Sequence, residues 1–312
     1  MLFACKYQNL VFELIDDPAR LAEASWIDVS EPTDEELALV GGLLPHPLPD
    51  EDDADEIESS TRSHVDEQGF HLSTLFLHQV EGRPENTSVT LVFANDRLVT
   101  VHDRDIPAVR LLRMRVRRRP ALLADPMDLF AGLFETAVLD LGDTLQELYR
   151  ALEETSHLVL EDPDADLEDS LERLAVHENI NGKVRLCLMD TRRDLAFVLR
   201  SGQVSKLAAK RLKYLMSEID ALLPHNNYLF EKVNFLLQAA QGFINIEQNQ
   251  IIKIFSVAAA AFLPPTLIAS IYGMNFENMP ELDWVYGYPL SIALMVISAV
   301  LPVIYFKRKG WL

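Results

Sequence analysis

The chain has 312 residues, enough for one large domain or two modest ones, and it carries a formal net charge of −20. A surface this acidic repels phosphate groups, which excludes nucleic acid as an expected partner, and it attracts cations. The two cysteines, Cys5 and Cys187, have no CxxC spacing, which excludes a thiolate zinc site and indicates a reducing compartment.

Residues 1–120 predict an α/β cytoplasmic domain that has no secretory signal. Thr33 and Glu36 have the spacing of a capping box, which predicts the start of a helix. The Ala-Asn-Asp turn before Arg97 predicts a hairpin. We expect the arginine-rich run over residues 109–119 to pair with neighbouring carboxylates. Runs of β-branched and aromatic residues predict strands over residues 25–30, 70–80, 87–96 and 97–103.

Residues 121–250 predict a helical cytoplasmic bundle and stalk. Asp125 followed by Pro126 is typical of an N-cap with proline in the first turn, and the apolar spacing continues to about residue 160. A second helix is expected over residues 166–200. A third helix begins near residue 205 and meets a kink or break at Pro224. Continued helix from there to residue 272 would be about 72 Å long, so its neighbours must be other helices or other copies of the chain.

Residues 251–312 predict a transmembrane domain of two helices. Residues 254–272 and 285–306 contain no charged residue, and each run is long enough to span about 30 Å of hydrocarbon. Lys253 precedes the first run and residues 307–309 are basic, whereas the connecting loop, residues 273–284, has no basic residue. The positive-inside tendency therefore predicts cytoplasmic termini and a loop that faces outward.

Two spans cannot enclose water, so an ion path requires several copies of the chain. A stripe of seven residues on the first span alternates spacings of three and four, which is typical of helices packed around an axis. The stripe fits a pore lining, and it equally fits a helix-packing face of small residues. Its members are Asn249, Ile252, Ser256, Ala259, Leu263, Thr266 and Ser270.

The loop sequence YGMNFENMPEL, residues 272–282, resembles the CorA family of magnesium transporters, whose signature tripeptide corresponds to Gly273, Met274 and Asn275. Residues 183–193, 222–226, 243–257 and 262–270 and the terminal YFKRKGWL resemble the proteobacterial type. This resemblance implies an inner-membrane homopentamer with a funnel-shaped cytoplasmic part, whose first spans line the pore. It implies Mg²⁺ as substrate, with Co²⁺ and Ni²⁺ as secondary ions, and gating by intracellular Mg²⁺. ZntB-type zinc transporters usually have isoleucine in place of Met274.

The expected ion chemistry follows from the hydration of Mg²⁺, which sheds its waters reluctantly. A ring of Asn275 amide oxygens accepts hydrogen bonds from ion-bound water. Thr266 and Asn249 are candidates for further rings of polar side chains deeper in the pore. Gly273 permits a sharp turn and Met274 packs against it. The acidic residues Glu277, Glu281 and Asp283 are expected to concentrate cations at the outer mouth.

The internal sensor is the least defined part of this prediction. Asp52, Asp53 and Asp55 are candidate acids for a regulatory Mg²⁺ site. No catalytic residue, no cofactor and no GxxxxGK phosphate loop is identified, so the chain is not expected to be an enzyme. The alternatives are a zinc transporter of the ZntB type, a membrane-anchored scaffold, and a metal-dependent hydrolase on a membrane anchor.

Overall fold

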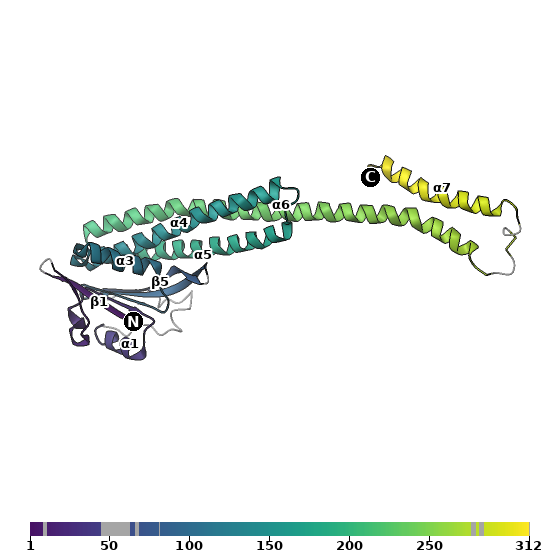
Figure 1. Cartoon of the computed structure of the whole chain (residues 1–312). Coiled ribbons are helices and arrows are strands. Elements are labelled where there is room, and N and C mark those ends of the chain that lie inside the picture. The colour runs from purple at the N-terminus through teal and green to yellow at the C-terminus, as the bar shows by residue number, and fades with distance from the viewer. Residues whose placement is uncertain are drawn as a thin grey trace. The chain divides into compact units, whose positions relative to one another are not determined.

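The computed structural model divides into two units, Met1–Leu237 and Gln238–Leu312, and each is described by itself. It describes residues 1–8, 11–44, 63–65, 69–80, 82–275, 279–280 and 284–311. The fold class is the expected one: an N-terminal α/β domain, a long helix and two apolar C-terminal helices (Figure 1).

The first unit contains a seven-stranded sheet with the order β2-β1-β3-β7-β6-β5-β4. Neighbouring strands are antiparallel except β3 and β7, which run parallel. Strands β1, β2 and β4 were not predicted from the sequence. The strands are β1 (Leu2–Gln8), β2 (Val11–Leu14), β3 (Trp26–Ser30), β4 (Ser63–Val65), β5 (Gly69–Val80), β6 (Arg83–Ala94) and β7 (Arg97–His102).

The predicted hairpin between β6 and β7 is confirmed. Asn95 and Asp96 have φ values of 52° and 56°, and Ala94 pairs with Arg97 across the turn. Two consecutive residues with positive φ characterise the type I′ turn, whose twist matches that of the flanking strands, and Asn and Asp tolerate this conformation well.

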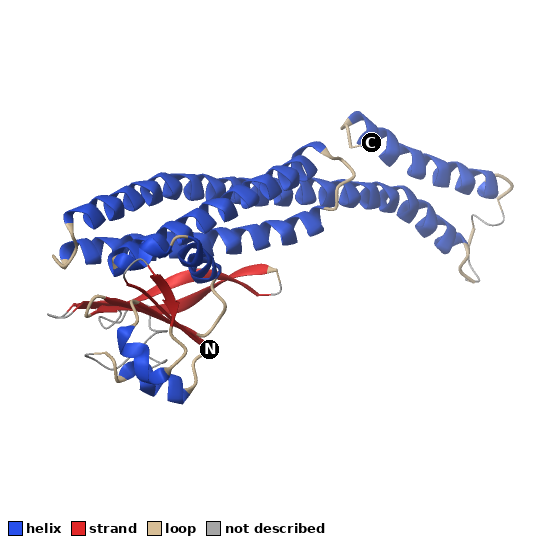
Figure 2. Cartoon of the chain, turned by 60° about the vertical axis from the view of Figure 1, so that its left-hand side comes forward, coloured by secondary structure: helices blue, strands red, loops and turns tan. Residues whose placement is uncertain are grey.

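Both faces of the sheet are covered. On one face, the ring of Phe70 packs at 5.4 Å from that of Phe130 of helix α4 (Pro126–Glu161), and Phe76 packs at 5.9 Å from Phe134. On the other face, Leu21 of the short helix η1 (Pro18–Glu23) and Val40 of α1 (Asp34–Gly41) join an apolar cluster with β3 and β7. The predicted capping box is present at the start of α1, with Thr33 and Glu36 bonded reciprocally. Figure 2 shows the long helices and α1 on opposite sides of the strands.

The arginine-rich run forms α3 (Pro107–Arg118), a helix that the sequence analysis did not identify. Its expected carboxylate partners exist for two of the arginines: Arg110 pairs with Asp105, and Arg113 pairs with the fully buried Asp28 of β3. Asp28 also accepts a hydrogen bond from Thr100 and lies 3.1 Å from the Nε2 atom of His102. This network ties α3 to the centre of the sheet.

Three long helices follow, α4 (Pro126–Glu161), α5 (Leu167–Arg200) and α6 (Lys206–Tyr272), with the short η2 (Pro120–Ala124) before them. The predicted starts are confirmed, since Asp125 caps α4 at Met127 N and Asp166 caps α5 at Glu168 N and Asp169 N. Such side-chain acceptors satisfy backbone N–H groups that have no partner in the first helical turn.

Of the two outcomes predicted at Pro224, a kink or a break, the break is excluded, because α6 continues through this residue and also through Pro264 and Pro265. Packing explains the continuity at Pro224. The side-chain nitrogen of the buried Asn226 donates to the Oδ1 and backbone O atoms of Asn181 on α5, at 2.8 and 2.9 Å, and Asn181 donates back to Asn226 O at 3.1 Å. These contacts, together with the fully buried Ile219 and Leu229, offset the single hydrogen bond that a proline removes.

Candidate ion pathway

In the second unit, the C-terminal part of α6 and the helix α7 (Gly287–Arg308) are apolar and mostly uncovered. Among the described residues, these two helices are long and apolar enough to cross a membrane, and only 6% of the most apolar stretch of each is buried. The core helix of a soluble protein would instead be mostly buried. Phe255, Phe262 and Leu267, for example, are 71, 73 and 62% exposed.

The predicted pore stripe is an uncovered face of α6. Six of its seven residues are exposed, and Ser256 is half-buried. The exposed members are Asn249, Ile252, Ala259, Leu263, Thr266 and Ser270. A polar and small-residue face that is bare in the single chain must be covered by water, lipid or further copies of the helix.

The opposite face of α6 has the least exposed residues of this segment. Val257 is buried, and Ala261, Pro264 and Ile268, which follow it at spacings of three and four, are half-buried. Both views show α7 running back beside the end of α6 (Figures 1 and 2). At about 100° per residue, the stripe residues point about 80–180° away from Val257, and Asn249 and Ser256, at about 80° and 100°, lie nearest the covered side.

Helix α7 has a matching seam of less exposed residues that was not predicted from the sequence. Its less exposed residues recur mostly at spacings of three and four, and Ser291 is 6% exposed; they are Gly287, Ser291, Met295, Ser298, Ala299, Pro302 and Phe306. Small residues at such spacing let two apolar helices approach closely, so this signal was present in the sequence. We conclude that α7 occupies one side of α6 and leaves the stripe free.

The hydroxyl group of Thr266 is already oriented by its own helix. Its Oγ1 atom donates to Phe262 O at 2.7 Å, the bond to the carbonyl four residues earlier that Thr often makes in helices. Because the single hydroxyl proton is used there, the lone pairs of Oγ1 remain available as acceptors. Thr266 can therefore receive hydrogen bonds from the waters around a cation.

The signature tripeptide begins directly where α6 ends at Tyr272. Gly273 N donates to Ala269 O at 2.9 Å, and Met274 N donates to Ile271 O at 3.3 Å. A Cβ atom at Gly273 would lie 3.1 Å from Ala269 O, closer than ordinary side-chain contacts. Met274 is 45% exposed, and Asn275 is also exposed. The glycine thus gives the room for a tight helix end, followed at once by two accessible side chains.

Six predicted site residues lie outside the described residues. They are the outer-mouth acids Glu277, Glu281 and Asp283 and the candidate sensing acids Asp52, Asp53 and Asp55. Within the part of the chain that the structure describes, no group of three or more His, Cys, Asp and Glu residues could hold a metal ion.

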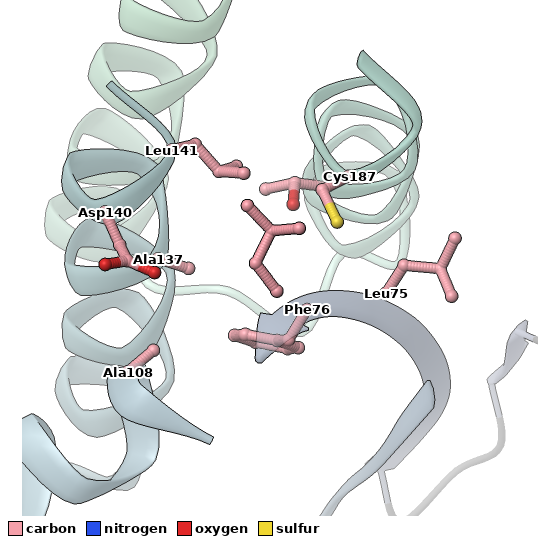
Figure 3. A pocket seen from close by; sticks show the side chains of 9 residues that line it. Leu75, Phe76, Ala108, Ala137, Asp140, Leu141 and Cys187 are labelled. Atoms are coloured by element: carbon pink, nitrogen blue, oxygen red, sulfur yellow. The ribbon is translucent and has the colours of Figure 1, made fainter. Parts of the chain in front are cut away.

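The first unit holds a cavity of about 10 Å³ between β5, α3, α4 and α5, which Figure 3 shows with Asp140 and Cys187 on opposite sides. This volume holds one water molecule at most. Burial and the nearby Asp143 and Glu147 raise the pKa of Asp140, and burial and Asp190 raise the pKa of the Cys187 thiol. A neutral buried thiol is unreactive, so this cavity is neither a nucleophilic site nor an ion path.

Comparisons with known proteins agree on one family. The family model of CorA-like Mg²⁺ transporter proteins matches residues 22–308. A Yersinia pseudotuberculosis protein named magnesium transport protein CorA is 44% identical over 300 residues, covering 96% of this chain and 95% of that protein.

Two solved structures show the fold. The complete CorA magnesium transporter from Methanocaldococcus jannaschii matches with a TM-score of 0.78 and 21% identity, covering 100% of this chain and 99% of that one. The ZntB cytoplasmic domain from Vibrio parahaemolyticus matches with a TM-score of 0.57 and 10% identity, covering 78% of this chain and 97% of that one. The likeness to ZntB is confined to the fold.

Proposed function

Since the chain belongs to the CorA family of magnesium transport proteins, we propose that it transports Mg²⁺ through a homopentameric pore in the inner membrane, with both termini in the cytoplasm. Magnesium transport itself follows from the family and from the close identity to curated relatives. The homopentamer, the location and the site residues are proposals, and we take residues 1–120, 121–250 and 251–312 as the α/β, stalk and pore domains.

One observation carries the pore proposal: the stripe from Asn249 to Ser270 lies on the face of α6 that α7 leaves free. An amide such as that of Asn249 has no water to bond when it faces lipid, which is costly in hydrocarbon, whereas the hydroxyl of Thr266 already donates to Phe262 O and needs water only for its lone pairs. If five copies of α6 turn this face toward a common axis, the polar groups contact the water inside the pore instead of lipid. Leu263 and Ile252 then form the narrow apolar rings, and Thr266 forms a ring of hydroxyl acceptors.

The ion is proposed to pass with most of its water shell. Mg²⁺ prefers octahedral oxygen coordination and loses water slowly, so a filter that removed every water would be slow. Asn275 side-chain oxygens hold the ion through its bound waters, and the neutral amide attracts a cation more weakly than a carboxylate ring does. Glu277, Glu281 and Asp283 raise the local cation concentration at the outer mouth. Co²⁺ and Ni²⁺ are proposed as secondary ions.

The driving force is the electrochemical gradient. A membrane potential acts on a divalent ion with about 4.6 kcal/mol per 100 mV, twice the value for a single charge. We propose that intracellular Mg²⁺ closes the pore by binding acidic groups between subunits, with Asp52, Asp53 and Asp55 as candidates. This is a transport function, and the proposal includes no catalytic step.

The test is a flux assay in vesicles containing the purified protein and a fluorescent Mg²⁺ indicator. The wild type is expected to admit Mg²⁺ without nucleotide, and Asn275→Ala is expected to lower the rate at least tenfold. Asn179→Ala is the matched control, because Asn179 is an exposed amide on α5 in the other unit. Equal flux through Asn275→Ala and the control would contradict the role of Asn275, while leaving magnesium transport itself standing.

A further inference from the structure

The first unit contains a basic pocket, which is unusual in a chain of net charge −20. Its volume is about 450 Å³, within the range of about 300–1,000 Å³ that small-molecule sites occupy. Four arginines and one glutamate line it, which gives the lining a net charge of +3. The charged lining residues are Arg115, Arg118, Arg119, Arg211 and Glu135.

Arg211 is the structural member of this set. Its guanidinium group donates to both carboxylate oxygens of Glu135, at 2.5 and 2.7 Å, and to Asp128 Oδ1 at 3.0 Å. The pair with Glu135 is bidentate, the geometry in which arginine binds carboxylates best. Arg211 is thus compensated, and the uncompensated positive charge of the pocket comes from the other three arginines.

Arg115, Arg118 and Arg119 are exposed and belong to the last turn of α3 and the residue after it. Residues three apart share one face of a helix, so Arg118 neighbours Arg115, and Arg119, the residue after the helix, lines the same pocket. None of the three has a carboxylate within salt-bridge distance among the residues that the structure describes, in contrast to Arg110 and Arg113 of the same helix. Three neighbouring positive charges without partners repel one another, and a multivalent anion would relieve that repulsion.

The floor of the pocket is apolar and close-fitting. It is made by the buried Leu112, by Leu122 and by Gly132 of α4, where an added Cβ would lie 3.5 Å from Leu112 Cδ1 and 3.8 Å from an Arg211 nitrogen. These are ordinary van der Waals distances, so the floor lies in direct contact with the helix surface at Gly132. A pocket with an apolar floor and guanidinium groups at its rim suits an organic anion with several charges.

We propose that this pocket binds a soluble anion with two or more linked phosphate groups, such as a nucleoside triphosphate. Planar guanidinium groups bind phosphate oxygens in pairs, and three of them can engage successive phosphates of one chain. The site is separate from the ion pathway, and it binds the anion without any chemical step.

The experiment measures binding of ATP, inorganic tripolyphosphate and adenosine to the full-length protein in detergent, in Mg²⁺-free buffer, by calorimetry. We expect saturable binding of ATP and tripolyphosphate that weakens with added salt, and none of adenosine. Replacing Arg115, Arg118 and Arg119 together by Gln is expected to weaken binding at least tenfold. The control replaces the three exposed arginines Arg150, Arg173 and Arg200 by Gln and is expected to stay within twofold of the wild type.

If the triple variant does not fold, Arg118→Gln alone is used, with a smaller loss of affinity expected in the same direction. Failure of ATP and tripolyphosphate to bind the wild type at millimolar concentration would overturn the proposal, and so would an equal loss in the control. The oligomeric state is measured on the same samples. If the wild type binds neither polyphosphate and the triple variant loses the oligomeric state of the wild type, these arginines belong to a contact between copies of the chain.

Discussion

The buried amide pair that joins α5 to α6 gives a prediction with a definite size. Asn226→Leu removes the two hydrogen bonds that its side chain donates to Asn181, at 2.9 and 2.8 Å. The Oδ1 atom of Asn181 is then left without a donor, and Asn181 is only 1% exposed. Leaving one buried polar group without a hydrogen-bond partner costs about 1–3 kcal/mol of folding free energy, and leucine cannot replace the lost hydrogen bonds. We expect a loss of about 2–3 kcal/mol in the free energy of unfolding.

The assay is thermal unfolding of the full-length protein in detergent, followed by near-ultraviolet circular dichroism. For a unit of this size, about 2–3 kcal/mol corresponds to a fall in melting temperature of roughly 4–12 °C. The double variant Asn181→Leu/Asn226→Leu is expected to be no less stable than either single variant, because it leaves neither side-chain amide stranded. Single variants within 1 °C of the wild type, or a double variant that shows the sum of the two losses, would refute this reasoning.

Two further predictions concern a buried acid and the glycine at the end of α6. Burial and the neighbouring Asp190 raise the pKa of Asp194 to about 7. The folded protein therefore keeps a proton on Asp194 at pH values where the unfolded chain has already released it. The stability that this bound proton contributes to the folded state is lost as the pH rises toward and through 7. Asp194→Asn should therefore gain in melting temperature relative to the wild type between pH 4 and pH 8, and a difference independent of pH would contradict the shift. Gly273→Ala is expected to slow Mg²⁺ flux in vesicles several-fold, because the new Cβ would lie 3.1 Å from Ala269 O, whereas Gly182→Ala, with no atom within 4 Å, should leave flux unchanged. Equal flux in both variants would show that the tight helix end is not required.

Local signals in the sequence predicted much of the fold correctly. Thr33, Asp125 and Asp166 lie at the helix starts, where their side-chain oxygens accept backbone N–H groups only two or three residues away. The hairpin between β6 and β7 was equally predictable, since the conformation of Asn95 and Asp96 depends on their own backbone sterics. The C-terminal spans followed from the length of uncharged sequence alone.

The signals that failed were those that depend on partners elsewhere in the chain. A proline is a reliable helix breaker only when nothing else holds the helix, and at Pro224 the Asn181–Asn226 contact does so. The first strands were missed because β1 contributes a short run whose place between β2 and β3 is decided by pairing with residues 26–29. The pore stripe stays a prediction, because its spacing supports a pore lining and a helix-packing face equally.

The sequence by itself determined the helix starts, the hairpin turn, the uncharged spans and the tripeptide that marks the family, because each depends on residues adjacent in the chain. Tertiary structure decided the order of the strands, the continuity of α6 through its prolines, and the gathering of Arg115, Arg118, Arg119 and Arg211 around one pocket. It also decided which face of α6 is covered by α7. Those features depend on the fit between surfaces that are far apart in the sequence, and the sequence of one such surface does not specify which other surface it packs against.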